Sequence, residues 1–281
     1  MSDYWSCGRF EFSLKRPLLM GIVNVTPDSF SDGGQHLSAE AAIAHARTLI
    51  VEGAQIIDLG AESTRPGALP VSVQEELARL LPVIAALRDS GAALSVDTCK
   101  PEVMQAALDA GADIINDVTG MRDPQAQRVV ARHPSCGVCV MHMQGEPRTM
   151  QLNPRYLNVV TEVSAALVAQ AQLLEKLGVQ RARISLDPGL GFGKTAEQNY
   201  QLLKGLATLV HSGYPVVLGA SRKSMLGAIT GKPVDQRLSG SIAAALAGIA
   251  RGVAVLRVHD VDATYDALKV WQSVQAAEDV K

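Results

Sequence analysis

An asparagine and two aspartates lie at and just beyond the end of the first long apolar run of this chain. The run 18–25 is apolar except for Asn24, and Asp28 and Asp32 follow it in a segment rich in hydroxyl and glycine residues. Such a run is typical of a strand that is buried on both faces, as in parallel sheets. Ligands of parallel α/β folds bind at the carboxyl ends of the strands, so we expect these polar groups to lie close to a functional site.

Polar residues end the other apolar runs of the chain in the same way. They are Glu62 to Arg65, Asp97, Asn116 and Asp117, His142, Asp187, Ser221 to Lys223, and Arg257 to Asp260. A single residue of this kind is equally well explained as a helix cap or a loop-positioning group. Eight strand ends that converge on one barrel mouth instead predict a functional site there.

The acids and the amide of this set predict the kind of ligand. Asp97, Asn116 and Asp187 would present two carboxylates and an amide from an apolar wall. This arrangement suits a flat heterocycle that carries several N–H donors, such as a pterin or a guanine. A buried carboxylate without such a partner would destabilise the fold. The alternative is that Asp97 and Asp187 pair with cations of the protein core.

The cations of the set gather at the last two predicted strands. Lys223, Arg257 and His259 concentrate positive charge where such barrels commonly bind phosphate, so a phosphorylated group is implied. Arg257 and His259 are two residues apart, so both side chains leave the same face of an extended strand. Two unrelated surface charges are the alternative. Asn24 could give one oxygen to Mg²⁺, which needs few protein ligands when it also binds phosphates and water.

The glycine-rich segment from Asp187 to Thr195 resembles a nucleotide-binding loop but fails the spacing test. A P-loop needs four residues between its first glycine and the Gly-Lys-Thr. The segment has three between Gly189 and Gly193. We instead expect its glycines to let the backbone approach a ligand and to place Phe192 at the mouth of the barrel.

Short apolar runs rich in β-forming residues alternate with helical patterns along the chain. The predicted strands are about 18–25, 55–60, 93–97, 113–118, 137–143, 183–187, 215–220 and 253–258. The predicted helices are 38–51, 71–89, 101–110, 123–132, 155–177, 196–211, 234–251 and 261–276, and a further helix begins at Ser224. This alternation predicts an α/β fold in which residues 1–281 form a single (β/α)8 barrel domain. Phe10, Phe12 and Leu14 alternate with polar residues, which predicts a short strand or hairpin at the bottom of the barrel.

The composition excludes several classes of protein. The chain has 281 residues with 26 basic and 28 acidic side chains, a formal net charge of −2, which gives no electrostatic footprint for nucleic acid or an anionic membrane. Lys15 and Arg16 precede an apolar stretch as in a signal peptide, but no small-residue cleavage site follows. No apolar stretch approaches the roughly 18 residues of a spanning helix, so we expect a soluble, cytoplasmic protein. Cys136 and Cys139 have redox or zinc spacing but are assigned to the core.

Five ordered segments resemble the dihydropteroate synthases, the folate-pathway enzymes that sulfonamide drugs inhibit. They are Gly21 to Gly34, Asp58 to Gly67, Asp187 to Lys194, Ser221 to Ser224 and Arg257 to His259, and the resemblance spans nearly the whole chain. It implies a transferase that joins 7,8-dihydropterin-6-ylmethyl diphosphate to 4-aminobenzoate and releases pyrophosphate, with Mg²⁺ as cofactor. It also implies a homodimer, and sulfonamides as ligands that compete with the aminobenzoate.

The same resemblance assigns individual residues to the substrates, the metal and catalysis. It places Asp97, Asn116, Met141, Asp187, Gly219 and Lys223 at the pterin, Asn24, Arg257 and His259 at the Mg²⁺ and diphosphate, and Phe30, Thr64, Arg65, Pro66, Phe192 and Ser224 at the aminobenzoate. Asn24 is the metal ligand of this set. The catalytic residues that it implies are Asp32, Asp97, Lys223, Arg257 and His259.

The reaction is expected to be dissociative, because an electron-rich pterin can stabilise the cation that remains when diphosphate departs. The site then acts through preorganised charge, and no covalent nucleophile is required. Cys99 is assigned a structural role. One alternative is an enzyme like the methyltetrahydrofolate:corrinoid methyltransferases, which would not need the diphosphate cluster. Another is a catalytically silent pterin-binding homologue, which would be expected to have lost Asn24, Lys223 or His259, and all three are present.

Overall fold

The structure is a computed structural model that describes residues 3–25, 34–62, 71–146 and 149–277, with the side chains of 34–38 outside this set. Eight parallel strands form the central sheet in the order β8-β7-β6-β5-β4-β3-β10-β9. Their bounds are Leu18–Asn24 (β3), Ile56–Gly60 (β4), Ala93–Asp97 (β5), Ile114–Asp117 (β6), Gly137–Met141 (β7), Ile184–Asp187 (β8), Val217–Leu218 (β9) and Val255–Val258 (β10). The predicted (β/α)8 barrel is confirmed.

The barrel closes between β8 and β9 through a short seam. One parallel bridge joins Leu186 to Val216, and the Leu186 amide donates to the Pro215 carbonyl at 2.9 Å. Strand β9 is shorter at both ends than the predicted 215–220, and at its start Pro215 has no N–H to donate to the ladder. The first long apolar run is the barrel strand β3 and pairs with β10 on one side and β4 on the other.

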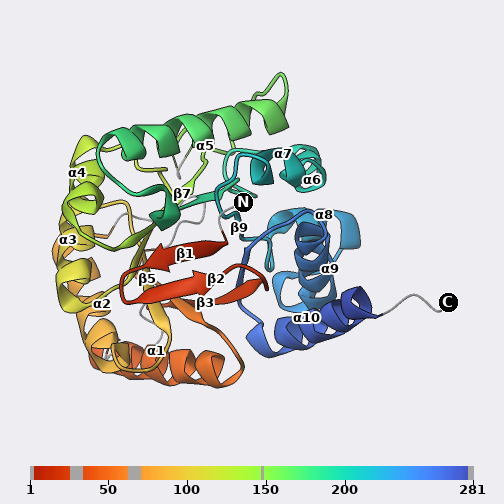
Figure 1. Cartoon of the computed structure of the whole chain (residues 1–281). Coiled ribbons are helices and arrows are strands. Elements are labelled where there is room, and N and C mark those ends of the chain that lie inside the picture. Colours follow the sequence, from red (N-terminus) through yellow and green to blue (C-terminus); the bar gives the residue numbers. More distant parts are fainter. Residues whose placement is uncertain (1–2, 26–33, 63–70, 147–148, 278–281) are drawn as a thin grey trace.

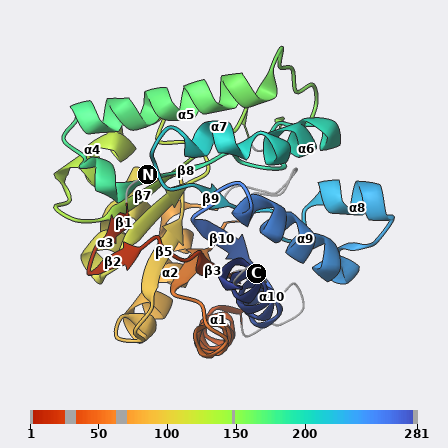
Figure 2. The same ribbon diagram turned by 45° about the vertical axis from the view of Figure 1, so that its right-hand side comes forward.

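Helices cover the outside of the strands as a ring (Figure 1), and helix α8 lies at its outer edge beyond α9 (Figure 2). The helices are Gly34–Val51 (α1), Val73–Leu87 (α2), Pro101–Ala110 (α3), Pro124–Arg132 (α4), Val159–Lys176 (α5), Ala196–Lys204 (α6), Leu206–Val210 (α7), Ser224–Thr230 (α8), Leu238–Ile249 (α9) and Val261–Ala276 (α10), with single 3₁₀ turns at Arg181–Arg183 and Val234–Gln236.

Several predicted helix boundaries differ from the structure. The predicted helix 38–51 begins at Gly34, 71–89 is Val73–Leu87, and 234–251 is a 3₁₀ turn at Val234–Gln236 followed by Leu238–Ile249. Two further differences have clear local reasons. The predicted helix 196–211 is split at Gly205, where an added Cβ would lie 2.7 Å from a methyl of Val160, so the backbone there packs too closely for a side chain. Helix α5 begins later than predicted because the Asn158 side chain caps it by accepting from the Thr161 amide at 3.1 Å.

A capping box fixes the start of α6, immediately after the glycine-rich segment. The Thr195 hydroxyl accepts from the Gln198 amide at 3.2 Å, and the Gln198 side chain accepts from the Thr195 amide at 2.8 Å. Two otherwise unpaired amides are satisfied in this way. The end of the glycine-rich segment is therefore anchored to a helix.

A hairpin covers the bottom of the barrel, as the sequence predicts. Strands Tyr4–Cys7 (β1) and Phe10–Ser13 (β2) pair antiparallel and lie across the strands in Figure 1. Trp5 is fully buried against the lower ends of the barrel strands, and its indole N–H donates to the Arg183 carbonyl at 3.1 Å. Cys136 and Cys139 are both buried in the core, which confirms their assignment. Within the described ranges, no helix combines the length and the apolarity that a membrane crossing needs.

Candidate active site at the barrel mouth

A pocket of about 990 Å³ opens at the carboxyl ends of the barrel strands. Every described residue of the predicted site lines it: Asn24, Asp97, Asn116, Met141, Asp187, Phe192, Gly219, Lys223, Ser224, Arg257 and His259. The other predicted site residues, Phe30, Asp32, Thr64, Arg65 and Pro66, lie outside the described residues. The sequence therefore predicted which of the described side chains meet at one place.

Arg257 links two carboxylates in the floor of this pocket. Its Nε donates to Asp58 Oδ2 at 2.6 Å, and a terminal nitrogen donates to Asp97 Oδ2 at 2.9 Å. Burial acts to lower the pKa of Arg257, but the two aspartates outweigh it and raise that pKa above its ordinary value. These contacts use two of the five N–H donors of the guanidinium. Arg257 therefore joins the two aspartates and still has N–H groups available to a ligand in the pocket.

Asp58 is a site residue to which sequence reasoning gave no role. Its side chain is fully buried and also accepts from the Ser95 hydroxyl at 2.6 Å and from the Asn116 amide at 3.2 Å. Asp58 thus fixes Arg257 and orients Asn116 from beneath. The signal was present, because a carboxylate in the middle of a strand that is buried on both faces must have partners.

Asp97 stands in the pocket wall and is paired. The ion pair with Arg257 corresponds to the alternative in which Asp97 contacts a core cation, yet both residues line the pocket. Burial raises the pKa of Asp97 to about 7, with Arg257 acting against it and Asp58 adding to it. The carboxylate therefore changes charge near neutral pH, where its protonation can be coupled to ligand binding.

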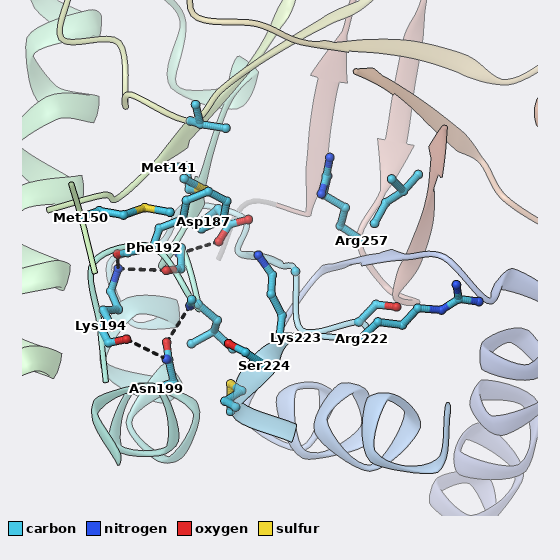
Figure 3. Close-up of a pocket in the computed structure, with 18 of the residues that line it drawn as sticks. Met141, Met150, Asp187, Phe192, Lys194, Asn199, Arg222, Lys223, Ser224 and Arg257 are labelled. Carbon is cyan, nitrogen blue, oxygen red and sulfur yellow. Dashed lines mark hydrogen bonds between the residues drawn. The ribbon is translucent and has the colours of Figure 1, made fainter. Parts of the chain in front are cut away.

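Asp187 and Lys223 face each other across the opposite part of the pocket. Figure 3 shows Lys223 extending between Asp187 on one side and Arg257 on the other. The Asp187 carboxylate accepts from the Gly189 amide at 2.7 Å, and its pKa is raised by burial. The Lys223 ammonium lies 4.2 Å from the centre of the Phe192 ring. Burial and the neighbouring Arg257 lower the pKa of Lys223 to about 8.

His259 is held by the segment that carries Lys223. Its backbone amide donates to the Ser221 hydroxyl at 3.2 Å, and its Nδ1 lies 3.0 Å from the same oxygen. Burial, together with Arg222 and Arg257, lowers the pKa of His259 to about 4. The ring is neutral at pH 7, which differs from the prediction that His259 adds positive charge; Lys223 and Arg257 supply that charge.

The glycine-rich segment 187–195, hereafter the β8–α6 loop, folds only because of its glycines. Gly189, Gly191 and Gly193 all have positive φ, at 65°, 83° and 64°. At Gly189 an added Cβ would overlap the carbonyl oxygen of His142. This conformation brings Phe192 beside the methionines of an apolar cluster, Met141, Met143 and Met150 with Val118, at one side of the pocket. Such a cluster offers a flat surface to a ring.

The described side chains of the pocket could hold a metal ion only if the substrate supplied some of the ligands. Among the described residues there is no group of three or more His, Cys, Asp or Glu side chains placed to hold an ion. Asn24, exposed at the end of β3, lines the pocket together with Arg257 and His259. An ion bound at Asn24 would take its other ligands from a phosphorylated substrate and from water, which Mg²⁺ accepts readily.

Comparison with known families agrees with this geometry. A profile of the family described as pterin binding enzymes matches residues 20–259, a span that runs from β3 to the end of β10 and includes all the described pocket residues named above. The chain belongs to the pterin-binding enzyme family. Its relatives among these pterin-binding enzymes include a dihydropteroate synthase from Neisseria meningitidis serogroup C, 50% identical over 274 residues that cover 96% of this chain and 97% of the relative.

Solved structures of pterin-binding enzymes are similar over nearly the whole chain. Dihydropteroate synthase from Xanthomonas albilineans with 4-aminobenzoic acid is 49% identical with a TM-score of 0.92, covering 99% of this chain and 100% of that one. The Burkholderia cenocepacia enzyme complexed with 7,8-dihydropteroate is 48% identical with a TM-score of 0.88, covering 97% and 96%. The Yersinia pestis enzyme in a sulfonamide drug complex is 41% identical with a TM-score of 0.91, covering 98% and 100%.

Proposed function

We propose that this protein is a dihydropteroate synthase, which joins 7,8-dihydropterin-6-ylmethyl diphosphate to 4-aminobenzoate and releases pyrophosphate. The observation that carries the proposal is the single pocket in which Asp97, Asn116 and Asp187 face Lys223 and Arg257. Acceptors for a heterocycle and cations for a diphosphate are thus combined in one place. Relatives with 4-aminobenzoic acid and with 7,8-dihydropteroate support the two substrates, and the relative with a sulfonamide supports such drugs as competing ligands.

The pocket recognises the pterin by complementary hydrogen bonds in an apolar setting. Asn116 and Asp187 accept from the N–H groups of the ring edge, and Lys223 donates to ring acceptors. Met141 contacts a face of the ring, and Phe192 of the same apolar cluster is assigned to the aminobenzoate. Charge-assisted hydrogen bonds of this kind each contribute about 1.5–3 kcal/mol because the partners are already ordered.

The reaction breaks the C–O bond between the pterin methylene and the diphosphate and forms a C–N bond to the aniline nitrogen, which then loses a proton. Arg257 stabilises the negative charge of the departing diphosphate, and neutral His259 can donate a hydrogen bond to it. The Asp97 carboxylate lies on the same floor and favours positive charge on the pterin. Fixed charges aimed at developing charge commonly supply much of an enzyme's rate enhancement.

We include Mg²⁺ in the proposal, with Asn24 as its protein ligand. The donor set fits, since the exposed Asn24 amide oxygen lines the same pocket as Arg257 and His259 and could complete the coordination of an ion chelated by diphosphate. When bound, the ion would neutralise charge on the leaving group. We place the reaction in the cytoplasm.

The direct test is pyrophosphate release from the pterin diphosphate, measured with and without 4-aminobenzoate in the presence of Mg²⁺. Formation of dihydropteroate in equal amount supports the proposal. Transfer of a methyl group from methyltetrahydrofolate to a corrinoid, without use of the diphosphate, would instead indicate the methyltransferase alternative. Pterin binding with no turnover of either substrate pair would indicate a silent homologue.

Activity should require ionised Asp97 and protonated Lys223, which gives a prediction about pH. The raised pKa of Asp97, about 7, means that the carboxylate is lost as the pH falls through that value. The lowered pKa of Lys223, about 8, means that the ammonium is lost as the pH rises through that value. We expect kcat/KM for the pterin substrate to be bell-shaped between these limits, measured from about pH 5.5 to about pH 9.5. Asp97→Asn should remove the acidic limb; an unchanged profile in that variant would contradict the assignment.

We also propose a homodimer, and exposed apolar side chains support a contact surface on the last helices. Ile229, Leu238, Val270 and Val274 are exposed on α8, α9 and α10. The alanines Ala244 and Ala245 of α9 are instead buried within the chain. We expect sedimentation equilibrium to give about twice the mass of 29.7 kDa. Val270→Glu should lower this mass toward that of the monomer, whereas Lys176→Glu, on the distant α5, should not.

A further inference from the structure

The β8–α6 loop contains a buried lysine at the edge of the pocket, and neither the predicted site nor the proposed reaction gives it a role. Lys194 is only 2% exposed. Its ammonium donates to the carbonyl oxygens of Gly189 and Phe192, both at 2.9 Å, and to that of His142 at 3.1 Å. The Nδ1 atom of the His142 ring also lies 3.1 Å away. An ammonium has three N–H donors, and here they are shared among the three backbone oxygens and the ring nitrogen.

The two loop peptides that Lys194 holds are those connected to the pterin-facing groups. Lys194 holds the carbonyl of Gly189, and the amide of the same residue donates to the Asp187 carboxylate at 2.7 Å, so a fixed Gly189 backbone helps to orient that acid. Phe192 presents its ring to the Lys223 ammonium at 4.2 Å. Lys194 is therefore linked to Asp187 through the backbone of Gly189 and to Lys223 through Phe192.

His142 completes the arrangement from the end of β7. Its backbone amide donates to the Asp187 carbonyl at 2.9 Å, which ties β7 to β8. The His142 ring packs at 6.1 Å from the Tyr156 ring, and the Tyr156 hydroxyl donates to the Gly193 carbonyl at 2.9 Å. Because the ring lies beside an ammonium and in a buried position, the neutral form with Nδ1 as acceptor is the form that fits.

We propose that Lys194 and His142 are a positioning pair for pterin binding. The Lys194 ammonium, held by three carbonyl oxygens and the His142 ring, fixes the conformation of the β8–α6 loop. In this conformation Asp187 and Lys223 are placed to bind the heterocycle. The inference deepens the proposed function and rests on it. A role in stability alone would affect both substrates and the fold together. A positioning role acts mainly on the pterin, since Lys194 reaches Asp187 through Gly189, whereas Phe192 is the one predicted 4-aminobenzoate residue that belongs to this loop.

The test compares Lys194→Met with Lys204→Met, the same change at an exposed lysine of α6. Methionine keeps the apolar stem in its buried place and removes the donors. We expect Lys194→Met to raise the KM for the pterin diphosphate and the Kd for dihydropterin by about 10- to 100-fold, the effect of a misplaced contact. The KM for 4-aminobenzoate should rise clearly less than the KM for the pterin diphosphate, and the circular dichroism spectrum should match that of wild type. Equal rises in both KM values, or no rise, would overturn the proposal.

Two further measurements keep the inference testable if Lys194→Met folds poorly. His142→Asn retains an acceptor near Nδ1 and should bind dihydropterin better than His142→Leu, by about tenfold; equal affinities would contradict the proposed role of the ring. In a cycle with Asp187→Asn, the double variant with Lys194→Met should lose much less than the sum of the two single losses, because Lys194 acts through Asp187. Additive losses would refute that route.

The calorimetric Kd separates this inference from the proposed function. If wild-type protein binds no dihydropterin, the proposed function fails. If wild type binds it and Lys194→Met binds it equally well, only the positioning role fails.

Discussion

Lys223→Ala is expected to lower kcat/KM for the pterin diphosphate by about two orders of magnitude or more, which is the scale of one preorganised polar contact in an active site. Lys223 extends between Asp187 and Arg257 and is packed against the Phe192 ring. Truncation removes the donor and the charge, and it leaves Asp187 facing a gap. Because the contact is to the pterin, the loss should appear in the pterin KM and in kcat, with the aminobenzoate KM little changed.

The measurement is steady-state pyrophosphate release with each substrate varied in turn. Lys232→Ala, at an exposed lysine just after α8, is the matched control and should behave like wild type. Turnover of Lys223→Ala within about threefold of wild type would remove Lys223 from the pterin site.

Gly189→Ala should abolish tight pterin binding, with a loss of about 100-fold or more, and should also lower the melting temperature. Two effects combine at this position. The φ of 65° is unfavourable for a residue with a Cβ, and the Cβ would overlap the His142 carbonyl oxygen, which is backbone and cannot move aside freely. The loop must shift, and the Gly189 amide then no longer orients the Asp187 carboxylate.

Gly178→Ala is the control that separates the effect of backbone strain from that of steric overlap with a neighbouring residue. Gly178 has a φ of 100°, yet no described atom lies within 4 Å of the position that its Cβ would take. That variant should lose about 1–2 kcal/mol of stability from backbone strain while binding dihydropterin normally. Thermal unfolding and calorimetric titration of both variants give the comparison. Normal dihydropterin affinity in Gly189→Ala would show that the loop conformation is not needed for binding.

The sequence predicted most of the fold because its signals were local. Buried parallel strands read as apolar runs, and each ended in a polar residue, so Asp97, Asn116 and Asp187 could be assigned to one mouth from topology alone. The N-terminal hairpin that contains Trp5 was likewise predicted, from the alternation of Phe10 and Phe12 with polar residues in the sequence.

The parts that the sequence did not predict depend on contacts between distant segments. Asp58 acquires its role only when the fold brings the Arg257 side chain within reach from β10, which lies on the far side of β3 and 199 residues later in the chain. The partners of Lys194 are backbone carbonyls whose directions depend on the positive φ angles of three glycines. The break at Gly205 depends on the packing of Val160 from α5. The order of residue types along the chain does not reveal how these side chains and carbonyl groups are oriented in the fold.

The short seam of the barrel gives the ligand a mechanical role. Strands β8 and β9 are joined by one bridge, at Leu186 and Val216, and Asp187 and Gly219 follow on the two sides of this joint. A pterin that binds Asp187 on the β8 side and Lys223 on the β9 side would link the two strands across this short seam of the barrel. A ligand that binds only the closed barrel stabilises it against separation of β8 from β9, so bound pterin would raise the free energy of opening at this seam.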